Sequence, residues 1–322
     1  MRSWWIQSRG DATALEAREV AIPQPGAGQL LVRLRAAGLN RGEFIAAHGL
    51  TQPGSAKPAG TEGSGEVAQL GAGVTGFGLG ERVMGRCPGA FAEFALMDAR
   101  EAIAVPTVLT WEEAGATPLA FLVVHDMLIG QGCLKAGEWP LVTGISSGVG
   151  VAALQAGKML GAHVIGTSRS QAKLDKLMAR GLDLGLCTPD FADAVIQATG
   201  GRGADLVVNA VGGSVFAECV RALGFEGRLA TVGYVDRVLK AEIDLEALHA
   251  RRPKLFGVSN KLRSAEQRAA TVRGFVADLL PALADGRIRP LVDRVFPFDQ
   301  LPRAKAFMEA NAQVGKIVLS SP

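Results

Sequence analysis

One stretch, residues 141–169, constrains the fold more than any other part of the chain. It reads LVTGISSGVGVAALQAGKMLGAHVIGTSR, which is an apolar run, a turn of small residues, a helical pattern and a second apolar run. This order is typical of a strand, a helix and a second strand. Consecutive parallel strands need such a crossover, so the stretch predicts a parallel sheet.

The turn before the helix has the composition of an anion-binding turn. Gly148 and Gly150 lack a Cβ, so the backbone can approach a bulky anion and the helix can pack closely on the strand. The N–H groups and dipole of the helix N-terminus attract a pyrophosphate. The spacing departs from G-x-G-x-x-G, because Gly144 and Ser146 stand at the first two turn positions. By itself the turn is also consistent with simple packing, because glycines between a strand and a helix often serve only that purpose.

The residues after the second strand favour one kind of dinucleotide. About 20 residues beyond such a turn, Asp or Glu binds the ribose 2′-OH of NAD, whereas Arg accommodates the 2′-phosphate of NADP. Ser168 and Arg169 stand there, and Lys173 follows one helical turn later. The pattern favours NADP over NAD, and the alternative is that both cations are ordinary surface charges.

Length and composition exclude several classes of protein. A chain of 322 residues suggests two domains, and 48% hydrophobic with 20% charged residues is typical of a soluble globular protein. A net charge of +3, without a basic run among aromatic residues, argues against nucleic acid or a membrane surface as partner. We expect neither a signal peptide nor a membrane span. The four cysteines form no C-x-x-C pair, which fits a reducing, cytoplasmic compartment.

The predicted secondary structure changes in kind near residue 118. Before it, the pattern predicts strands at 29–35, 63–70, 82–84 and 91–97, a glycine-rich turn at 71–80, and a helix that begins at Trp111 with Thr110 as N-cap. After it, helices at 121–129, 190–199 and 214–223 alternate with buried strands at 184–187, 205–209, 227–233 and 255–258. This alternation predicts an α/β, doubly wound parallel sheet. A long helix at 264–284 and strands at 296–298 and 315–319 follow, and we expect the last segment to pack on the first domain.

Several stretches together resemble the medium-chain dehydrogenase/reductase superfamily, and within it the zinc-free quinone oxidoreductase (zeta-crystallin-like) branch. They are AGLNR at 37–41, GTEGSGEV at 60–67, SGVG at 147–150, NAVGG at 209–213, FMEAN at 307–311 and VGKIVL at 314–319. The resemblance implies a β-rich, GroES-like catalytic domain formed by residues 1–118 and 261–322. It implies a Rossmann domain inserted at 119–260, and a homodimer joined near 255–259.

The zinc-dependent relatives carry Cys, His and Glu ligands around these motifs, and this sequence departs from them. Asn40 stands near the expected Cys, and Thr61 stands before Glu62 where His is expected. The segment 84–95, which would carry the structural zinc lobe, holds only Cys87. His48, His125, His163 and His249 have no ligand spacing, so we expect no zinc. Glu62 is expected to have a structural role or to pair with a local donor.

Carried over to this chain, the resemblance implies the contacts of bound NADPH. They are Ser146, Ser147, Gly148, Val149 and Gly150 at the pyrophosphate; Ser168, Arg169 and Lys173 at the 2′-phosphate; Asn209 and Val211 under the adenosine; Gly233 and Tyr234 near the nicotinamide ribose; the backbone of Phe256 and Val258 at the carboxamide; Asn40 near the nicotinamide, where it would position the substrate; and Asn311 and Lys316 closing the site.

The resemblance implies hydride transfer from NADPH to a quinone, with the resulting oxyanion protonated by water. A runner-up is an NADPH-dependent alkenal or enone reductase, because both reactions use the same hydride donor and an apolar acceptor pocket. A third reading is a non-enzymatic NADPH-binding protein. Many relatives have a tyrosine where Ile45 and Ala46 stand, and a threonine where Val123 stands, so the polar rim of the nicotinamide pocket is thinner here.

Overall fold

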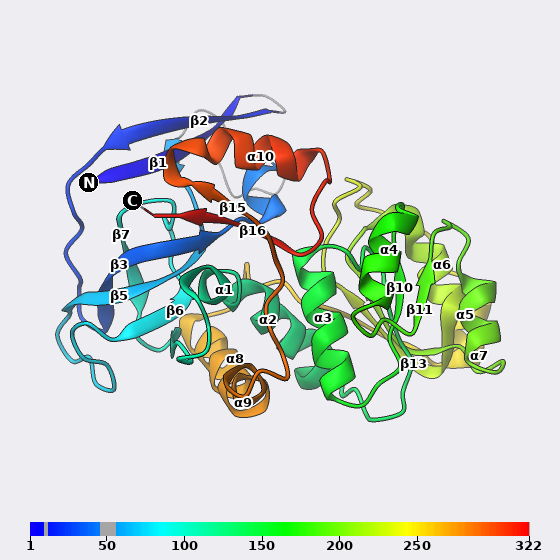
Figure 1. Cartoon of the computed structure of the whole chain (residues 1–322). Coiled ribbons are helices and arrows are strands. Elements are labelled where there is room, and N and C mark those ends of the chain that lie inside the picture. Colours follow the sequence, from blue (N-terminus) through cyan, green and yellow to red (C-terminus); the bar gives the residue numbers. More distant parts are fainter. Residues whose placement is uncertain (10–11, 46–55, 322) are drawn as a thin grey trace. The chain divides into compact units, whose positions relative to one another are not determined.

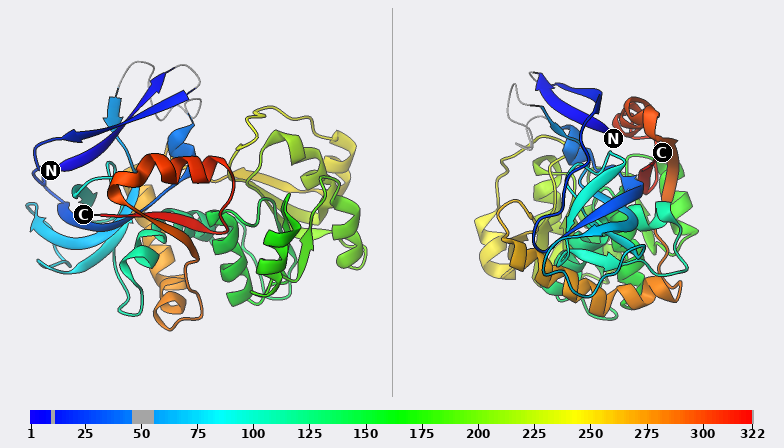
Figure 2. Two further views of the ribbon diagram at one scale, coloured as in Figure 1. Left: turned by 45° about the horizontal axis from the view of Figure 1, so that its top comes forward. Right: turned by 90° about the vertical axis from the view of Figure 1, so that its left-hand side faces the viewer.

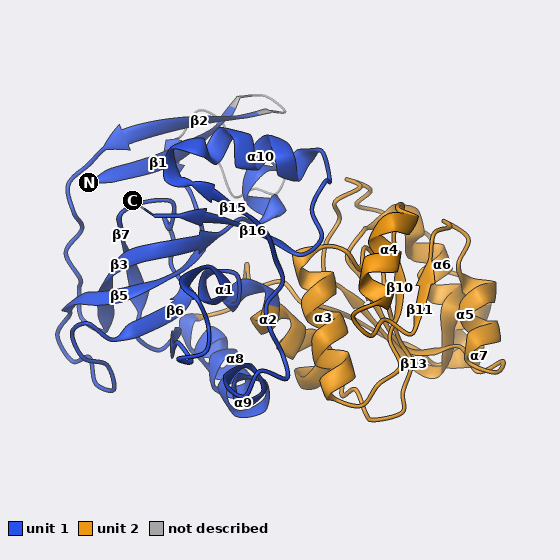
Figure 3. Cartoon of the chain, viewed as in Figure 1, with its two compact units in different colours: residues 1–120, 265–322 blue, residues 121–264 orange. Residues whose placement is uncertain are grey.

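The computed structural model describes residues 1–9, 12–45 and 56–321 of the chain. It divides into two compact units, which Figure 3 shows in different colours. Unit 1 comprises Met1–Ala120 and Ala265–Pro322, and unit 2 comprises Phe121–Ser264. The borders between the units therefore fall at 120/121 and 264/265, whereas the sequence predicts them at 118/119 and 260/261. Unit 2 is an insertion in the sequence of unit 1.

A small antiparallel sheet of unit 1 has the strand order β2–β1–β4, and Figure 1 shows its strands β1 and β2 side by side. Its strands are β1 at Arg2–Arg9, β2 at Ala12–Glu19 and β4 at Ala56–Pro58. The sequence pattern does not predict β1 or β2. β2 reads ATALEARE, which consists largely of helix-favouring residues. Its pairing with β1 along its whole length overrides that preference.

Within the described residues, the larger sheet of unit 1 has the order β15–β16–β3–β5–β6–β8, with β7 paired to β3. The bounds are β3 Gln29–Gly38, β5 Glu62–Leu70, β6 Arg82–Arg86, β7 Phe94–Asp98, β8 Ala102–Ala104, β15 Val292–Pro297 and β16 Lys316–Ser320. β3 is a central strand, so Leu30, Val32 and Leu34 are buried. β16, drawn in red in Figure 2, pairs antiparallel with β3 and parallel with β15. The C-terminal segment thus returns to unit 1, as predicted.

Helix α1 (Trp111–Gly115) begins where the sequence predicts it. The Thr110 hydroxyl accepts a hydrogen bond from the backbone N–H of Glu113 at 3.2 Å. The Glu113 carboxylate accepts one from the backbone N–H of Thr110 at 3.0 Å. This reciprocal capping box satisfies two N–H groups that the first turn leaves without helical partners. The stretch 71–80 forms turns, also as predicted.

The prediction of one long helix at 264–284 is wrong. The segment forms α8 (Ala265–Asp278) and α9 (Leu280–Ala284), separated at Leu279. The physical reason is Pro281, which has no N–H to donate and whose ring clashes with the preceding turn. Proline is tolerated in the first turn of a helix, so α9 begins afresh there. The strand predicted at 91–97 also starts later, at Phe94.

The core of unit 1 joins residues from both ends of the chain. Trp4 of β1 donates its indole N–H to the carbonyl of Phe298 at 2.8 Å, and both side chains are buried. Phe298 begins the short helix η5 (Phe298–Gln300), which α10 (Leu301–Glu309) follows. Leu301 and Met308 of α10 pack into the same core. In the N-terminal part of the chain, η1 (Arg41–Phe44) follows β3 and contributes Phe44 to this core.

Every residue of unit 2 is described, and its sheet has six parallel strands in the order β11–β10–β9–β12–β13–β14. The strands are β9 Pro140–Val142, β10 Ile165–Thr167, β11 Leu184–Leu186, β12 Ala204–Asn209, β13 Leu223–Thr231 and β14 Lys254–Gly257. The helices between them are α3 Gly148–Met159, α4 Gln171–Met178, α5 Ala192–Ala198, α6 Phe216–Ala222 and α7 Leu245–Arg251, with η4 Gly213–Val215. The order reverses between β9 and β12, which defines the doubly wound fold that the sequence predicts.

One strand of unit 2 is not buried as predicted. The sequence predicts a buried strand at 255–258, but Leu255 is 41% exposed and most of β14 lies at the surface. β14 pairs only with β13, because it is the edge of the sheet. Before β9, the predicted helix at 121–129 is present as α2 (Pro118–Val124) continued by the wider turns of η3 (His125–Gly130).

A helix that crosses a bilayer must be about 20 residues long and largely apolar. None of the helices in the described part of the chain is both long enough and apolar enough to do so.

Candidate functional site

The glycine turn of unit 2 joins β9 to α3. Gly144 has a φ of +64°, a conformation that glycine adopts without strain. Gly150 is buried, and a Cβ there would lie 2.5 Å from the carbonyl oxygen of Ile145 and 2.7 Å from that of Gly144. The Ser147 hydroxyl caps α3 by accepting a hydrogen bond from the N–H of Gly150 at 3.0 Å. The turn therefore places the start of α3 directly at the end of β9.

This arrangement gathers the predicted pyrophosphate residues at one helix N-terminus. Ser146, Ser147, Gly148, Val149 and Gly150 form the last residues of the turn and the first of α3. An α-helix leaves its first N–H groups without helical partners and carries a partial positive charge at that end. Ser147 satisfies only one of these N–H groups, so the end of α3 retains its attraction for an anion.

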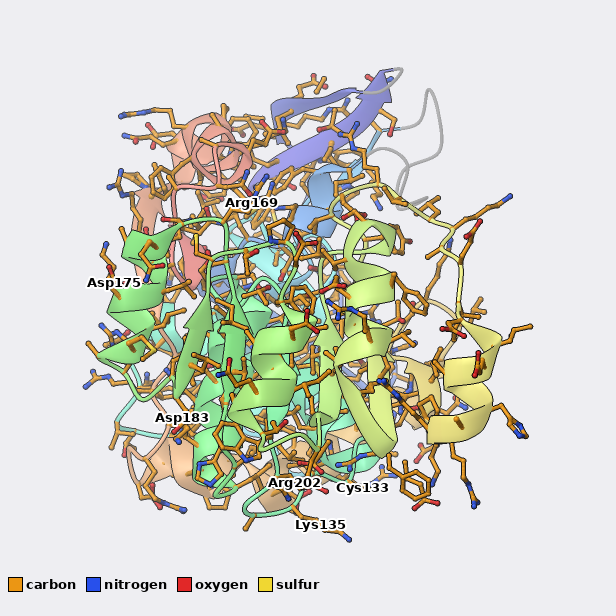
Figure 4. All side chains as sticks on the ribbon, turned by 90° about the vertical axis from the view of Figure 1, so that its right-hand side faces the viewer. Cys133, Lys135, Arg169, Asp175, Asp183 and Arg202 are labelled. Carbon is orange, nitrogen blue, oxygen red and sulfur yellow. The ribbon has the colours of Figure 1, made fainter. Side chains whose placement is uncertain are left out.

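Arg169 lies just beyond the end of β10, the strand next to β9. Ser168 is half-buried and Arg169 is exposed. Within the described residues, Arg169 makes no hydrogen bond and no ion pair. Figure 4 shows Arg169 at one end of the unit 2 sheet, and Asp183, Arg202 and Lys135 at the opposite end. Because β9 and β10 are parallel, Arg169 and the start of α3 share the end at which these strands finish. Lys173, on α4, is half-buried.

The other predicted residues of unit 2 follow the ends of neighbouring strands. Val211 follows β12, Gly233 and Tyr234 follow β13, and Val258 follows β14. The strands are parallel, so their ends meet at one side of the sheet. We call this side the carboxyl edge, and it comprises Ser146–Gly150, Ser168, Arg169, Asn209, Val211, Gly233, Tyr234 and Val258. Phe256 lies within β14 and is half-buried.

Asn209 has a local role that the sequence pattern does not reveal. Its amide oxygen accepts hydrogen bonds from the N–H groups of Val211 and Gly212, both at 3.0 Å, and its amide nitrogen donates to the carbonyl of Gly212 at 2.9 Å. Asn209 is buried, and the Thr143 hydroxyl lies 3.3 Å from its amide oxygen. The side chain thus fixes the loop after β12, and its contact with an adenosine stays a prediction.

The three predicted residues of unit 1 fall into two places. Lys316, at the start of β16, is buried and donates to Glu62 at 2.6 Å, to Asn40 Oδ1 at 2.8 Å and to the carbonyl of Leu39 at 3.0 Å. These bonds use all three N–H donors of its ammonium group. Asn311 is exposed after α10 and accepts a hydrogen bond from Arg41 at 2.8 Å. Closure of the site by these residues remains a prediction.

Lys316 and Asn40 belong to a buried polar cluster, which comprises Asn40, Glu43, Thr61, Glu62 and Lys316. Glu62 is fully buried and accepts hydrogen bonds from Lys316, from the Asn40 amide at 2.9 Å and from the N–H of Leu119 at 2.7 Å. Glu62 thus pairs with donors, one of the two alternatives that the sequence leaves open, although these donors stand 22, 57 and 254 residues away in the sequence. The positions that hold Cys and His in zinc-dependent relatives are here an amide and a hydroxyl, both bonded within the cluster.

Glu43 is the member of the cluster that the sequence does not predict. Its Oε1 accepts hydrogen bonds from the Thr61 hydroxyl and, at 3.1 Å, from the Asn40 amide. Its Oε2 is buried and has no hydrogen-bond partner among the described residues. Burial raises the pKa of Glu43 from 4.5 to about 7, although Thr61, Asn40 and Lys316 oppose the shift. The only local signal is the spacing of Asn40 and Glu43 across one turn of η1.

The described histidines and cysteines form no evident site. His125 is buried in η3, and His48 and Ala46 lie outside the described residues. Cys87 is buried beside the cluster, and burial raises the pKa of its thiol well above the usual range. Among residues 1–9, 12–45 and 56–321, no three His, Cys, Asp or Glu side chains are grouped so that they could hold a metal ion.

Two family models match this chain. One is described as a zinc-binding dehydrogenase and matches residues 186–319, and the other is described as an alcohol dehydrogenase GroES-like domain and matches residues 26–107. The two matches fall in the C-terminal and N-terminal parts of the chain respectively.

Curated relatives extend the match to nearly the whole chain. A component of the phenolphthiocerol/phthiocerol polyketide synthase of Mycobacterium tuberculosis is 31% identical over 321 residues, which is 98% of this chain and 15% of that component. The chain thus spans a small part of that relative. The synaptic vesicle membrane protein VAT-1 homolog of Homo sapiens is 30% identical over 327 residues, which is 96% of this chain and 83% of that protein.

Solved structures agree in fold. A mycobacterial protein, Rv1454c, was solved in complex with NADPH; it is 28% identical, has a TM-score of 0.89, and the match covers 99% of this chain and 100% of that one. A mycobacterial structure described as a quinone oxidoreductase is also 28% identical, with a TM-score of 0.86 and 99% coverage of both chains.

Proposed function

Because this chain belongs to the medium-chain dehydrogenase/reductase superfamily, and within it to the zinc-free quinone oxidoreductase branch, we propose that it reduces a quinone with NADPH. The observation that carries the proposal is the exposed charge of Arg169 beside the N-terminus of α3. An oxidoreductase needs a hydride donor, and this edge has the chemistry to bind a phosphorylated dinucleotide.

The residues of the carboxyl edge fit NADPH on two counts. The absence of a Cβ at Gly150 lets α3 begin tightly against the turn, so its N–H groups can face a pyrophosphate. Arg169 supplies a planar, permanently charged donor for a 2′-phosphate, and it has no competing partner within the described residues. A relative of the same fold was solved with NADPH, which supports the assignment.

In this mechanism the chain binds, orients and shields the reacting groups. Ser147 holds the first turn of α3, and Asn209 fixes the loop after β12, so that the carboxyl edge is preorganised. Bound NADPH supplies the hydride. Asn40 is fixed by Glu62 and Lys316 and would position the nicotinamide and the acceptor. A quinone needs no Lewis acid to accept a hydride, and the amide of Asn40 and the hydroxyl of Thr61 are poor zinc donors.

The acceptor can also be a conjugated enone, whose carbon–carbon double bond would be reduced. The same donor and an apolar pocket serve both reactions, so product analysis separates them: a hydroquinone or semiquinone against a saturated ketone. We propose further that the chain works in the cytoplasm and forms a homodimer through β14, whose outer edge is exposed. Sedimentation that finds only monomer at micromolar concentration would remove the dimer. The third reading, a protein that binds NADPH without turnover, predicts binding alone.

The test is consumption of NADPH in the presence of small quinones and enones, followed by absorbance. Oxidation that depends on the quinone, with NADH a weaker donor, is the expected result. Tight NADPH binding without any acceptor being reduced would favour the non-enzymatic reading. Failure of both nucleotides to bind would contradict the oxidoreductase proposal, and would leave the glycine turn as a packing device.

A further inference from the structure

The buried polar cluster contains two carboxyl groups in opposite electrostatic situations. Both oxygens of Glu62 are engaged, one of them by the ammonium group of Lys316 at 2.6 Å. Glu43 makes no ion pair with a cation within 4 Å among the described residues, and its Oε2 is buried without a partner. A single ammonium inside the cluster cannot neutralise two carboxylates. Glu62 holds that ammonium, so Glu43 is the group for which the neutral, protonated form is favoured.

The charged and titratable groups that face Glu43 come from several elements. The carboxylate of Glu62 on β5 raises the pKa of Glu43, and the ammonium group of Lys316 on β16 lowers it. Lys57 on β4 and the thiol of Cys87 after β6 also interact with Glu43. Burial lowers the pKa of Lys57, although the charge of Glu43 raises it. The net result is that burial raises the pKa of Glu43 to about 7, so near neutrality the carboxyl both holds and releases a proton.

Thr61 provides a way out for that proton. Its hydroxyl donates a hydrogen bond to Oε1 of Glu43. When Oε1 carries a proton the bond reverses, so that Glu43 donates to the Thr61 oxygen and the hydroxyl proton can turn toward another acceptor. Thr61 is half-buried, whereas Glu43 is buried. A hydroxyl can donate one proton while it accepts another. The Asn40 amide lies 3.5 Å from the Thr61 oxygen and 3.1 Å from Glu43, so the same side chain that would position the acceptor also holds this pair.

We propose that Glu43 stores the proton of the reaction and passes it through the Thr61 hydroxyl to the reduced acceptor. The proposal rests on the proposed function, in which Asn40 lies beside the nicotinamide. It replaces water as the proton source, and it gives a source of protons to a chain that has Ile45 where many relatives have a tyrosine.

Electrons and protons balance in this step. The acceptor gains a hydride, and with it two electrons, which NADPH loses as it becomes NADP⁺. The oxyanion that results forms an O–H bond with the proton of the Thr61 hydroxyl, and the Thr61 oxygen takes the proton of the Glu43 carboxyl. Glu43 is left as a carboxylate and regains a proton from water. In this step Thr61 would contact the acceptor, and Glu43 would act through Thr61 as a positioning and proton-holding residue.

The first experiment needs no turnover. The infrared carboxyl bands of the full chain, without added nucleotide, are followed as a function of pH in wild type and Glu43→Gln. We expect a protonated carboxyl that titrates near pH 7 in the wild type and is missing from Glu43→Gln. The control is Glu66→Gln, the same substitution at a half-buried glutamate of β5 that pairs with Arg35. This variant should keep the band. A Glu43 carboxyl that titrates near its ordinary 4.5 overturns the proposal.

The second experiment is the pH profile of kcat/KM with NADPH and the acceptor found to be reduced. In the wild type and in Glu66→Gln the rate should fall as pH rises through about 7, because Glu43 loses its proton. Glu43→Gln should lack this limb and be slower at lower pH by about a hundredfold, a typical effect of losing an acid catalyst. The two rates should converge at alkaline pH, where water supplies the proton to both.

Variants of Thr61 separate delivery from a purely structural role. Thr61→Val keeps the shape but loses the hydroxyl, and should slow the reaction as Glu43→Gln does, whereas Thr61→Ser should restore most of the rate. A Glu43→Gln enzyme that keeps the alkaline limb, or a Thr61→Val enzyme as fast as wild type, overturns the proposal while the proposed function stands. If the wild type reduces no acceptor, the proposed function fails. The proposed proton transfer through Thr61 then fails with it, whatever the infrared titration shows.

Discussion

The buried polar cluster of unit 1 and the carboxyl edge of unit 2 handle charge in opposite ways. In the cluster, Lys316 gives all three of its donors to groups of the same unit, and Glu62 is fully buried. At the carboxyl edge, Arg169 is exposed and has no partner among the described residues. The cluster pairs Lys316 with Glu62 inside the fold, whereas the carboxyl edge leaves Arg169 in solvent, where a ligand can bind it.

The comparison shows that burial determines whether a charged residue contributes mainly to folding or mainly to binding. A buried charge that loses its partner costs several kcal/mol, so changes in the cluster should affect folding first. An exposed arginine contributes little to folding, so changes at Arg169 should affect binding alone. Substitutions in the two regions test this distinction. The expected changes in the free energy of unfolding range from several kcal/mol in the cluster to about 1 kcal/mol at the helix caps.

Removal of the cation from the cluster should have the largest effect. Lys316→Met leaves Glu62 buried without its cation, and we expect the free energy of unfolding to fall by about 3–5 kcal/mol. The measurement is urea unfolding followed by circular dichroism. The control is Lys305→Met, which removes a lysine paired with the exposed Glu309 on α10 and should cost less than about 1 kcal/mol. Equal losses in the two variants would show that the cluster is not electrostatically special.

The pH dependence of stability should reveal Glu43. Its folded pKa of about 7 lies above its ordinary 4.5, so ionisation opposes folding. The contribution of the neutral carboxyl is complete below pH 4.5 and is lost as pH rises through about 7. Glutamine cannot ionise, so above that pH Glu43→Gln should be more stable than wild type by up to about 3 kcal/mol.

Urea unfolding of both proteins across this range measures the gap, which should close as pH falls toward 4.5. Glu66→Gln serves again as the control, because it keeps Glu43 and should therefore lose stability over the same pH range as the wild type. A gap of constant size would mean that Glu43→Gln acts through packing and not through ionisation.

The two regions also differ in how far the sequence predicts them. The elements of the carboxyl edge lie within single βαβ units, so the apolar runs, the glycines and Arg169 stand close together in the sequence. Local periodicity is enough to predict β9, α3 and β10. The cluster instead joins Glu62 to Lys316, which are 254 residues apart, and no local pattern reports such a pairing.

Most of the remaining errors have the same cause. β2 has helix-favouring residues and becomes a strand only because β1 pairs with it, and β14 is exposed only because no strand lies beyond it. The pKa of Glu43 depends on burial, which is a property of the packed unit. By contrast, Thr110 and Pro281 act within one helical turn, so the local sequence contains the signal for the start of α1 and for the break before α9.

At the carboxyl edge, Arg169→Ala should change binding and leave folding alone. A charge-assisted contact with the 2′-phosphate should make the loss of NADPH affinity about tenfold or more, with NADH affinity unchanged. Calorimetric titration of both nucleotides measures this. Lys135→Ala removes an exposed cation at the opposite end of the sheet and should leave both affinities as they are (Figure 4). A similar loss for NADH would place the contribution of Arg169 somewhere other than the 2′-phosphate.

The smallest effects should come from two helix caps, one in each unit. Ser147 caps α3 at the carboxyl edge, and Thr110 caps α1 in unit 1. Replacement of either by alanine removes one hydrogen bond to a first-turn N–H and should cost about 0.5–2 kcal/mol of stability. Only Ser147→Ala disturbs the helix end that would face the pyrophosphate, so it should also weaken NADPH binding a few-fold, while Thr110→Ala should not. Urea unfolding and nucleotide titration of the matched pair give both numbers. If Thr110→Ala weakens NADPH as much, the loss reflects general destabilisation, and the N-terminus of α3 has no particular part in binding.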